Sequence, residues 1–322
     1  MRRREFISLL GGAAATWPIA ARAQQQTMPV VGVLDSIGSA ATLPAFRDGL
    51  AQMGYVAGRN VALDVRSTDN YDRLPELARD LASGPVAAIA ALGGPSAPAA
   101  KAASATIPIV FTIGGDPIEL GLVASISRPG GNITGVTFFT AQLLQKQIGL
   151  VHELLPNARA FGLLLNPENP RARADLASAE GAARSIDIDL HVANASATRE
   201  FESAFAAFQQ KRVDAVIIAG DPLVFRESSS VAALTTRYAM PAIMGTGRFA
   251  REGGLLGYGT IVTDSLRQAG VYIGRILKSE RPGDLPVLQP TKFELVINLK
   301  TAKALSIEVP PTLLALADEV VE

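Results

Sequence analysis

Four short segments place acidic, hydroxyl-bearing or glycine residues where buried apolar runs end. These segments are Asp35-Ser36, Gly93-Gly94-Pro95-Ser96, Thr112 to Asp116, and Gly220-Asp221. In open parallel sheets, ligands bind beyond the carboxyl ends of the strands. Helix N-termini converge there and present free N–H groups with a partial positive charge. The four segments therefore predict a binding site for a small solute.

Several of these residues allow two interpretations. Ser96 follows two glycines at a predicted helix start, so its hydroxyl and nearby amides either hold a carboxylate or form an ordinary helix entry. Asp116-Pro117 and Asp221-Pro222 both fit an Asp N-cap with Pro at the first helical position. A capping carboxylate has a second oxygen, which can meet an ammonium or hydroxyl group of a ligand.

The motifs that would indicate catalysis or a cofactor are missing from the sequence. The Gly-Gly-Pro-Ser string lacks the Lys-Ser/Thr ending of a P-loop, and Gly38-Ser39-Ala40 has the wrong spacing for a dinucleotide fingerprint. No Gly-x-Ser-x-Gly elbow occurs. His152 and His191 are the two histidines, and there is no cysteine, which argues against a transition-metal site. We expect no enzymatic activity, no cofactor and no metal.

Short apolar runs alternate with amphipathic stretches along the chain, which predicts parallel, doubly wound α/β sheets. The length of 322 residues suits two such units. Gly115-Asp116-Pro117 and Gly220-Asp221-Pro222 each follow a predicted strand, one in each half, and suggest an internal duplication. We expect the last segment, 311–322, to be a helix.

The N-terminus has the order of a secretory signal: basic, then apolar, then small residues. Arg3-Arg4-Glu5-Phe6-Ile7 resembles a twin-arginine export motif, and Ala21-Arg22-Ala23 offers a cleavage site after Ala23. An ordinary secretory route and a short membrane anchor are the alternatives. However, Trp17-Pro18 interrupts an apolar run that is shorter than the ~20 residues of a membrane span. The absence of cysteine excludes a lipidated N-terminal Cys, so we expect an unanchored periplasmic protein.

The composition limits the class of partner. Thirty basic and thirty acidic residues balance, which leaves no basic excess for nucleic acid or a membrane surface. Aromatic residues make up 6% of the chain, and its one Trp lies in the predicted signal. Few stacking surfaces are therefore available for sugars or bases.

Several longer strings are similar to those of ABC-transporter substrate-binding proteins, including relatives that bind aromatic amino acids of the tryptophan type. The most distinctive are Arg128-Pro129-Gly130-Gly131-Asn132-Ile133-Thr134-Gly135-Val136 and Phe293-Glu294-Leu295-Val296-Ile297-Asn298-Leu299-Lys300. Ile107-Pro108-Ile109-Val110-Phe111, Tyr258-Gly259 and Asp284-Leu285-Pro286-Val287 add to the likeness, which covers the whole mature chain.

The resemblance implies a type I periplasmic binding fold with two Rossmann-like lobes and a hinge. Lobe one would hold 28–138 and 262–288, and lobe two 139–261 and 289–322. The chain would cross between them near Phe138, Ile261 and Gln289. The implied function is the periplasmic component of an ABC importer, a monomer that closes around an amino acid or a related small carboxylate or amide and is then recognised by the permease subunits.

The resemblance also suggests roles for individual residues. Ser96 and Thr112 match the positions that hold a ligand carboxylate, and Asp221 matches the position that holds an ammonium. We include Asp35, Ser36, Gly94, Asp116 and Tyr258 as further candidates; Phe138 and Phe139 are other aromatic residues near the expected cleft. A periplasmic sensor or chemoreceptor partner with the same fold remains an alternative. A repressor effector domain would instead require a helix-turn-helix where the export signal stands.

Overall fold

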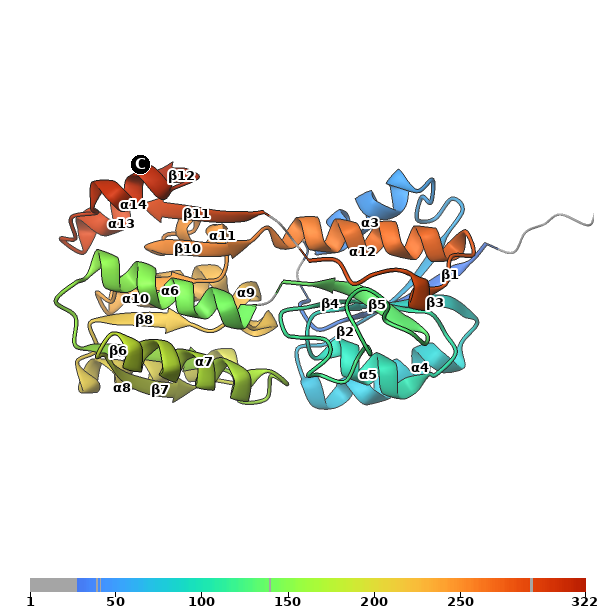
Figure 1. Ribbon diagram of the computed structural model, residues 1–322, viewed down its shortest axis with the longest axis horizontal. Coiled ribbons are helices and arrows are strands. Elements are labelled where there is room, and N and C mark those ends of the chain that lie inside the picture. Colours follow the sequence, from blue (N-terminus) through green and yellow to red (C-terminus); the bar gives the residue numbers. More distant parts are fainter. Residues whose placement is uncertain (1–27, 39, 41, 139, 290–291) are drawn as a thin grey trace, which may run out of the picture.

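The computed structural model describes residues 28–38, 40, 42–138, 140–289 and 292–322. The predicted signal at 1–23 and Phe139 lie outside this part of the chain. The described residues form two α/β lobes side by side (Figure 1). Among them, we find no helix that combines the length and apolar character needed to cross a membrane.

The first lobe is built on a parallel sheet of five strands in the order β2-β1-β3-β4-β5. The strands are β1 (Val30–Asp35), β2 (Ala62–Ser67), β3 (Val86–Leu92), β4 (Ile109–Ile113) and β5 (Ile133–Thr137). Side chains alternate between the two faces of a strand. In β3, Ala88, Ala90 and Leu92 face one apolar cluster, and Ile89 and Ala91 face the other. Both faces of this sheet are therefore buried.

Four helices cover these two faces. They are α3 (Thr42–Gln52) and α12 (Val262–Leu277) on one side, and α4 (Leu74–Ser83) and α5 (Ser96–Ala103) on the other. A short 3-10 turn, η1 (Tyr71–Arg73), precedes α4, and another, η3 (Pro282–Asp284), follows α12. The helix α12 comes from late in the sequence, so the chain returns to the first lobe after it has built most of the second (Figure 1).

The second lobe is built on a sheet of seven strands in the order β12-β11-β10-β9-β8-β6-β7. The strands are β6 (Ala160–Leu165), β7 (Asp189–Asn194), β8 (Ala215–Ile218), β9 (Ala242–Met244), β10 (Leu256–Thr260), β11 (Phe293–Asn298) and β12 (Glu319–Val321). Neighbouring strands are parallel except β10 and β11, which pair antiparallel. The reversed pair occurs where the chain re-enters this sheet.

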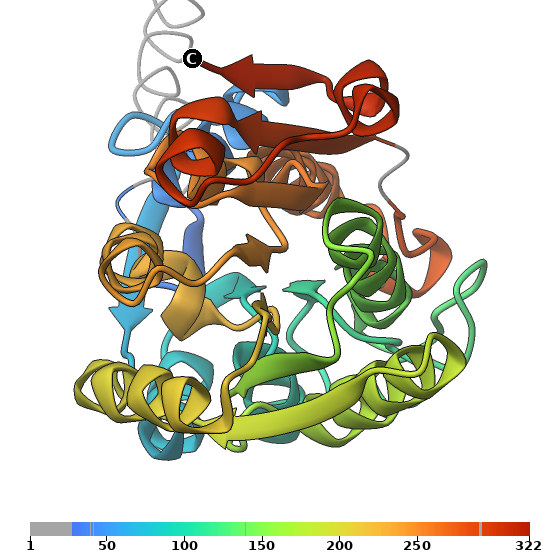
Figure 2. The same ribbon diagram turned by 90° about the vertical axis from the view of Figure 1, so that its left-hand side faces the viewer.

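Helices also cover both faces of the second sheet (Figure 2). One apolar cluster draws residues from α6 (Thr140–Leu154), α7 (Ala172–Ser185), α13 (Leu299–Ala304) and α14 (Pro311–Leu316). The other draws on α8 (Phe201–Lys211), which follows η2 (Thr198–Glu200), and on α9 (Pro222–Arg226), α10 (Ser228–Arg237) and α11 (Gly247–Arg251).

The predicted C-terminal helix is wrong in its second half. The helix α14 ends at Leu316, and β12 then adds to the sheet edge with Val320 beside Ile297. Asp318 fixes this turn, because its carboxylate accepts from the Leu295 N–H at 2.7 Å and its own N–H donates to the Leu295 carbonyl. Two successive β-branched valines favour a strand here.

The chain passes between the two sheets three times: after β5, after β10 and before β11. An isolated parallel bridge between Val136 and Leu288 holds two of these segments together. The lobe boundaries of 28–138 plus 262–288 and 139–261 plus 289–322 stay a prediction.

Glycines bring α3 and α12 into close contact. A Cβ at Gly49 would overlap the Arg267 carbonyl of α12, and a Cβ at Gly270 would overlap the Phe46 carbonyl of α3. Both obstacles are backbone atoms, which cannot rotate away as a side chain can. This contact fixes α12 to the first lobe and so determines where the chain crosses between the lobes.

We expect Gly270→Ala to lower the free energy of unfolding by about 1–3 kcal/mol, because overpacking at the α3–α12 crossing outweighs the gain in helix propensity. Gly181→Ala in α7 is the matched control. Its Cβ meets nothing within 4 Å, so it should raise stability by about 0.5–1 kcal/mol. Urea denaturation measures both, and equal effects of the two substitutions would contradict this account.

Candidate functional site

The loops that follow the strands of both sheets meet between the lobes, and direct hydrogen bonds join them. The Tyr71 hydroxyl, in the loop after β2, donates to the Asp221 carboxylate after β8, at 3.0 Å from Oδ1 and 3.2 Å from Oδ2. Arg226 of α9 reaches back across the gap to Asp69, with Nη2 3.8 Å from Oδ2. The lobes are therefore closed onto each other in this structure.

Asp221 is the centre of this contact. Its side chain is only 2% exposed. Oδ1 accepts from the Leu223 N–H at 2.8 Å, so Asp221 caps α9, as its position before Pro222 predicts. Oδ2 accepts from Asn169 Nδ2 at 2.6 Å. The carboxylate thus combines the capping role with side-chain contacts from two other loops.

Tyr71 is held as the hydrogen-bond donor by its surroundings. Burial of the ring raises the pKa of Tyr71 well above its ordinary value, and the negative charge of Asp221 and the hydrogen bond to it add to the shift. All three effects disfavour the phenolate. The hydroxyl therefore keeps its proton and donates a hydrogen bond to Asp221.

Asp35 organises the loop after β1. Its Oδ1 accepts from the backbone N–H groups of Ile37 at 2.8 Å and Gly38 at 3.2 Å, and its Oδ2 accepts from the Thr42 hydroxyl at 3.4 Å. Burial raises the pKa of Asp35, while these hydrogen bonds and Arg226 oppose the rise. The carboxylate fixes the path from β1 into α3, and its oxygens face its own loop.

The hydroxyls of Ser36 and Ser96 support the first lobe from within. Both donate to the Leu92 carbonyl, at 3.2 Å and 3.1 Å. The Thr112 hydroxyl accepts from the Gly93 N–H at 3.1 Å. Gly93 has φ of +97°, and a Cβ there would overlap the Ser36 hydroxyl, so only glycine fits this turn.

The structure therefore brings Ser36, Gly94, Ser96 and Thr112 together around the end of β3. Gly94 is partly exposed, and a Cβ there would meet nothing within 4 Å. The α5 helix begins at Ser96, so its N-terminal end adjoins this turn. The ends of these strands face the second lobe, since Pro222 lies close to Gly93.

The other candidates, Asp116, Tyr258 and Phe138, make no hydrogen bond to Asp221 or to its partners among the described residues. Asp116 is partly exposed and caps its own loop, since Oδ1 accepts from the Ile118 N–H at 2.7 Å. The Tyr258 ring stacks on Phe293, with centroids 6.4 Å apart, and packs against the apolar cluster beneath α6. Phe138 is buried. Their roles in binding stay predictions.

Two cavities lie between the lobes, each lined from both sides. One, of about 170 Å³, is lined by Ile37, Thr42 and Val262 of the first lobe and by Phe225 and Thr246 of the second. The other, of about 470 Å³, lies between the loop 114–120 and the start of α7. There the buried Arg171 and Asp175 form an ion pair. Among the described residues, no cluster of His, Asp and Glu could hold a metal ion.

Sequence reasoning missed three residues of this site: Tyr71, Asn169 and Phe225. Tyr71 follows β2 and Asn169 follows β6, so the rule about strand ends could have found both if it had been applied to every parallel strand. Phe225 lies one helical turn after Asp221, and its ring lies near Gly220 and Gly245. It gives the second lobe an aromatic surface between the lobes.

We expect Tyr71→Phe to shift the solute-free protein toward an open arrangement, because a hydrogen bond to a charged acceptor contributes about 1.5–3 kcal/mol. Small-angle X-ray scattering should then give a larger radius of gyration. Tyr238→Phe is the control, because its hydroxyl donates to Glu202 within the second lobe. If both variants scatter like the unmodified protein, the Tyr71 contact does not hold the lobes closed.

Comparisons with known proteins agree with this geometry. A curated tyrosine-binding protein of Clostridioides difficile (strain R20291) is 27% identical over 264 residues, 82% of this chain and 76% of that protein. A solved conserved domain protein of Vibrio cholerae O1 biovar eltor is 26% identical, with a TM-score of 0.84 over 91% of this chain and 99% of the other. An ABC domain of Streptococcus pneumoniae in complex with L-Trp is 24% identical, with a TM-score of 0.81 over 90% of this chain and 100% of the other.

These likenesses confirm the predicted fold, two α/β lobes of the type I periplasmic binding proteins. The profile of the family described as ABC transporter substrate binding protein matches residues 29–321. Proteins of this family work in the periplasm or outside the cell. Because the match spans almost every described residue, this chain belongs to the ABC transporter substrate binding protein family.

Proposed function

We propose that this protein is the solute-binding component of an ABC importer and captures an aromatic α-amino acid between its lobes. The observation that carries the proposal is the buried Asp221 carboxylate, which faces the first lobe where the strand ends of both sheets meet. The tyrosine-binding relative and the solved L-Trp complex support the choice of solute. Closure is a hinge motion at the three crossing segments, and the permease subunits recognise the closed form.

The chemistry of the site suits a zwitterion. A carboxylate offers about four acceptor positions, and three donors reach Asp221: the Leu223 N–H, the Asn169 amide and the Tyr71 hydroxyl, which is shared between both oxygens. The remaining position can accept from the ammonium of the solute. The solute carboxylate then lies at the N-terminal end of α5, beside Ser96, where the helix dipole favours an anion.

The aromatic side chain of the solute lies against Phe225, which lines the smaller cavity between the lobes. Offset or edge-to-face contacts between aromatic rings contribute about 0.5–1.5 kcal/mol beyond the burial of area. This contact would favour tyrosine, tryptophan and phenylalanine over aliphatic amino acids of similar size.

The proposal includes where and in what form the protein works. The mature protein is a periplasmic monomer, exported by the twin-arginine route and cleaved near Ala23. It carries out no reaction on the solute. Its lobes divide at the crossings near Phe138, Ile261 and Gln289.

Isothermal titration calorimetry with tyrosine, tryptophan and phenylalanine tests the solute class. We expect saturable binding of one molecule to each chain, together with a rise in melting temperature. A solute at 100 times its Kd stabilises the folded state by about 2.7 kcal/mol. The proposal fails if none of the three amino acids binds or shifts the melting temperature.

Asp221→Asn separates the two roles of this side chain. Asparagine caps helices about as well as aspartate, but its single acceptor oxygen cannot take all three donors, so stability should fall by about 1–3 kcal/mol. Affinity for the amino acid should fall about tenfold or more, because the charge that meets the ammonium is gone. Asp214→Asn, a carboxylate that accepts from the Arg159 and Ala160 N–H groups at the start of β6, should bind normally. If both variants bind equally well, Asp221 is only a helix cap.

A further inference from the structure

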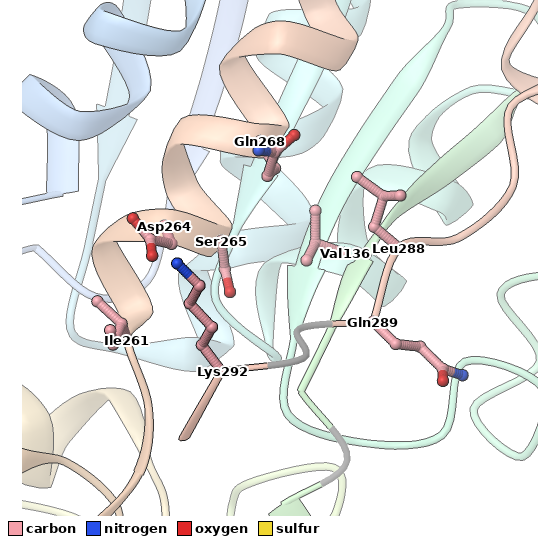
Figure 3. Close-up of a pocket in the computed structure, with 8 residues that line it drawn as sticks. All are labelled: Val136, Ile261, Asp264, Ser265, Gln268, Leu288, Gln289 and Lys292. Carbon is pink, nitrogen blue, oxygen red and sulfur yellow. The ribbon is translucent and has the colours of Figure 1, made fainter. Parts of the chain in front are cut away.

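A third cavity, of about 450 Å³, lies among the segments that cross between the lobes (Figure 3). Its walls come from the crossing segments: Val136 of β5, Ile261 before α12, Leu288 and Gln289 after η3, and Lys292 before β11. The first turns of α12 complete the walls with Asp264, Ser265 and Gln268. The volume falls within the range of small-molecule pockets, about 300–1,000 Å³.

Ser265 is the feature that points to a ligand. The residue is 2% exposed, and its buried hydroxyl has no hydrogen-bond partner among the described residues. Buried polar groups in folded proteins nearly always have a partner, so an unpartnered hydroxyl requires an explanation. Figure 3 shows this hydroxyl directed into the cavity, on the side that Lys292 approaches.

The charges around the cavity favour an anion. The carboxylate of Asp264 at the rim forms an ion pair with Arg267, which neutralises it. No ion pair of the described residues includes Lys292, whose side chain extends toward Asp264 in the first turn of α12 (Figure 3). That turn is the N-terminus of a 16-residue helix, and no side chain of the described residues caps it. A partial positive charge, a lysine and a free hydroxyl therefore lie together, beside the carboxylate of Asp264 that Arg267 pairs with.

The opposite wall of the cavity is apolar. Val136 and Leu288 lie there, across from Ser265 and Lys292 (Figure 3). A fully charged, strongly hydrated anion such as phosphate would gain nothing from this wall. A carboxylate with a short hydrocarbon chain would place its charge at Lys292 and its chain against Val136 and Leu288.

We propose that this hinge cavity is a second binding site, which takes a small aliphatic monocarboxylate. The carboxylate accepts from the Ser265 hydroxyl and pairs with the Lys292 ammonium. Ser265 is on a helix of the first lobe, whereas Lys292 directly precedes a strand of the second-lobe sheet. A ligand that contacts both residues binds one relative orientation of the two lobes more tightly than another. It therefore shifts the equilibrium between the open and closed forms.

Calorimetric titration of the protein with butyrate tests this site, with Ser265→Ala and Lys292→Gln as the variants. We expect saturable binding that each variant weakens about tenfold or more, as for the loss of a hydrogen bond to a charged group. The controls are Ser228→Ala, another buried and unpartnered hydroxyl, and Lys278→Gln, an exposed lysine at the end of α12. Both controls should bind butyrate like the unmodified protein.

Two results would overturn the proposal: no saturable binding of butyrate, or binding that Ser265→Ala and Lys292→Gln leave unchanged. Titrations of the same variants with tyrosine distinguish this site from the cleft. We expect both hinge variants to remain folded and to keep the tyrosine affinity of the unmodified protein. Failure of tyrosine to bind the unmodified protein would count against the proposed function and leave the butyrate result intact.

Discussion

The hydrogen bond from Tyr71 to Asp221 is the contact on which the arrangement of the two lobes depends. A buried carboxylate is costly unless donors surround it. The second lobe supplies two of these donors, the Leu223 N–H and the Asn169 amide, and the first lobe supplies the third. Opening the cleft would remove the third donor and expose the carboxylate to water, so closure and the removal of Asp221 from water are the same event.

This coupling explains how a small solute can move two large lobes. Among the described residues, the polar contacts that join the lobes directly are Tyr71 with Asp221, and Arg226 with Asp69 and the Ile37 carbonyl. Such contacts contribute a few kcal/mol at most, since exposed ion pairs contribute about 0–1 kcal/mol each. A solute that binds both lobes needs to add only a comparable amount to change the populations of the open and closed forms.

Close backbone packing anchors the second crossing segment in both lobes. Gly49 and Gly270 allow α12 to pack backbone to backbone on α3, which fixes one end of the second crossing. At its other end, Gly257 and Gly259 of β10 let the loop 245–247 lie directly on the strand, where any Cβ would overlap backbone atoms. Under the proposed hinge closure, motion would be confined to the short segments between these anchors.

Much of the fold could be predicted from the sequence, because strand–helix alternation is a local pattern. The end of β8 at Asp221 was found in the same way. Tyr71 and Asn169 were missed, although each also follows a strand. Their importance depends on which loops of the two lobes face each other, and this is a property of tertiary structure. The close packing at Gly49 and Gly270 and the β12 strand depend on contacts between distant segments, which no local pattern shows.

The full chain contains no cysteine, which permits the most direct test of the central claim that the lobes close around an amino acid. Glu76→Cys on α4 and Gln209→Cys on α8 place one spin label on an exposed position of each lobe. Pulsed electron paramagnetic resonance then measures the distance between the two labels. We expect saturating tyrosine or tryptophan to shift the distribution to shorter and narrower distances. A distribution that stays unchanged while the amino acid binds would contradict closure around the solute.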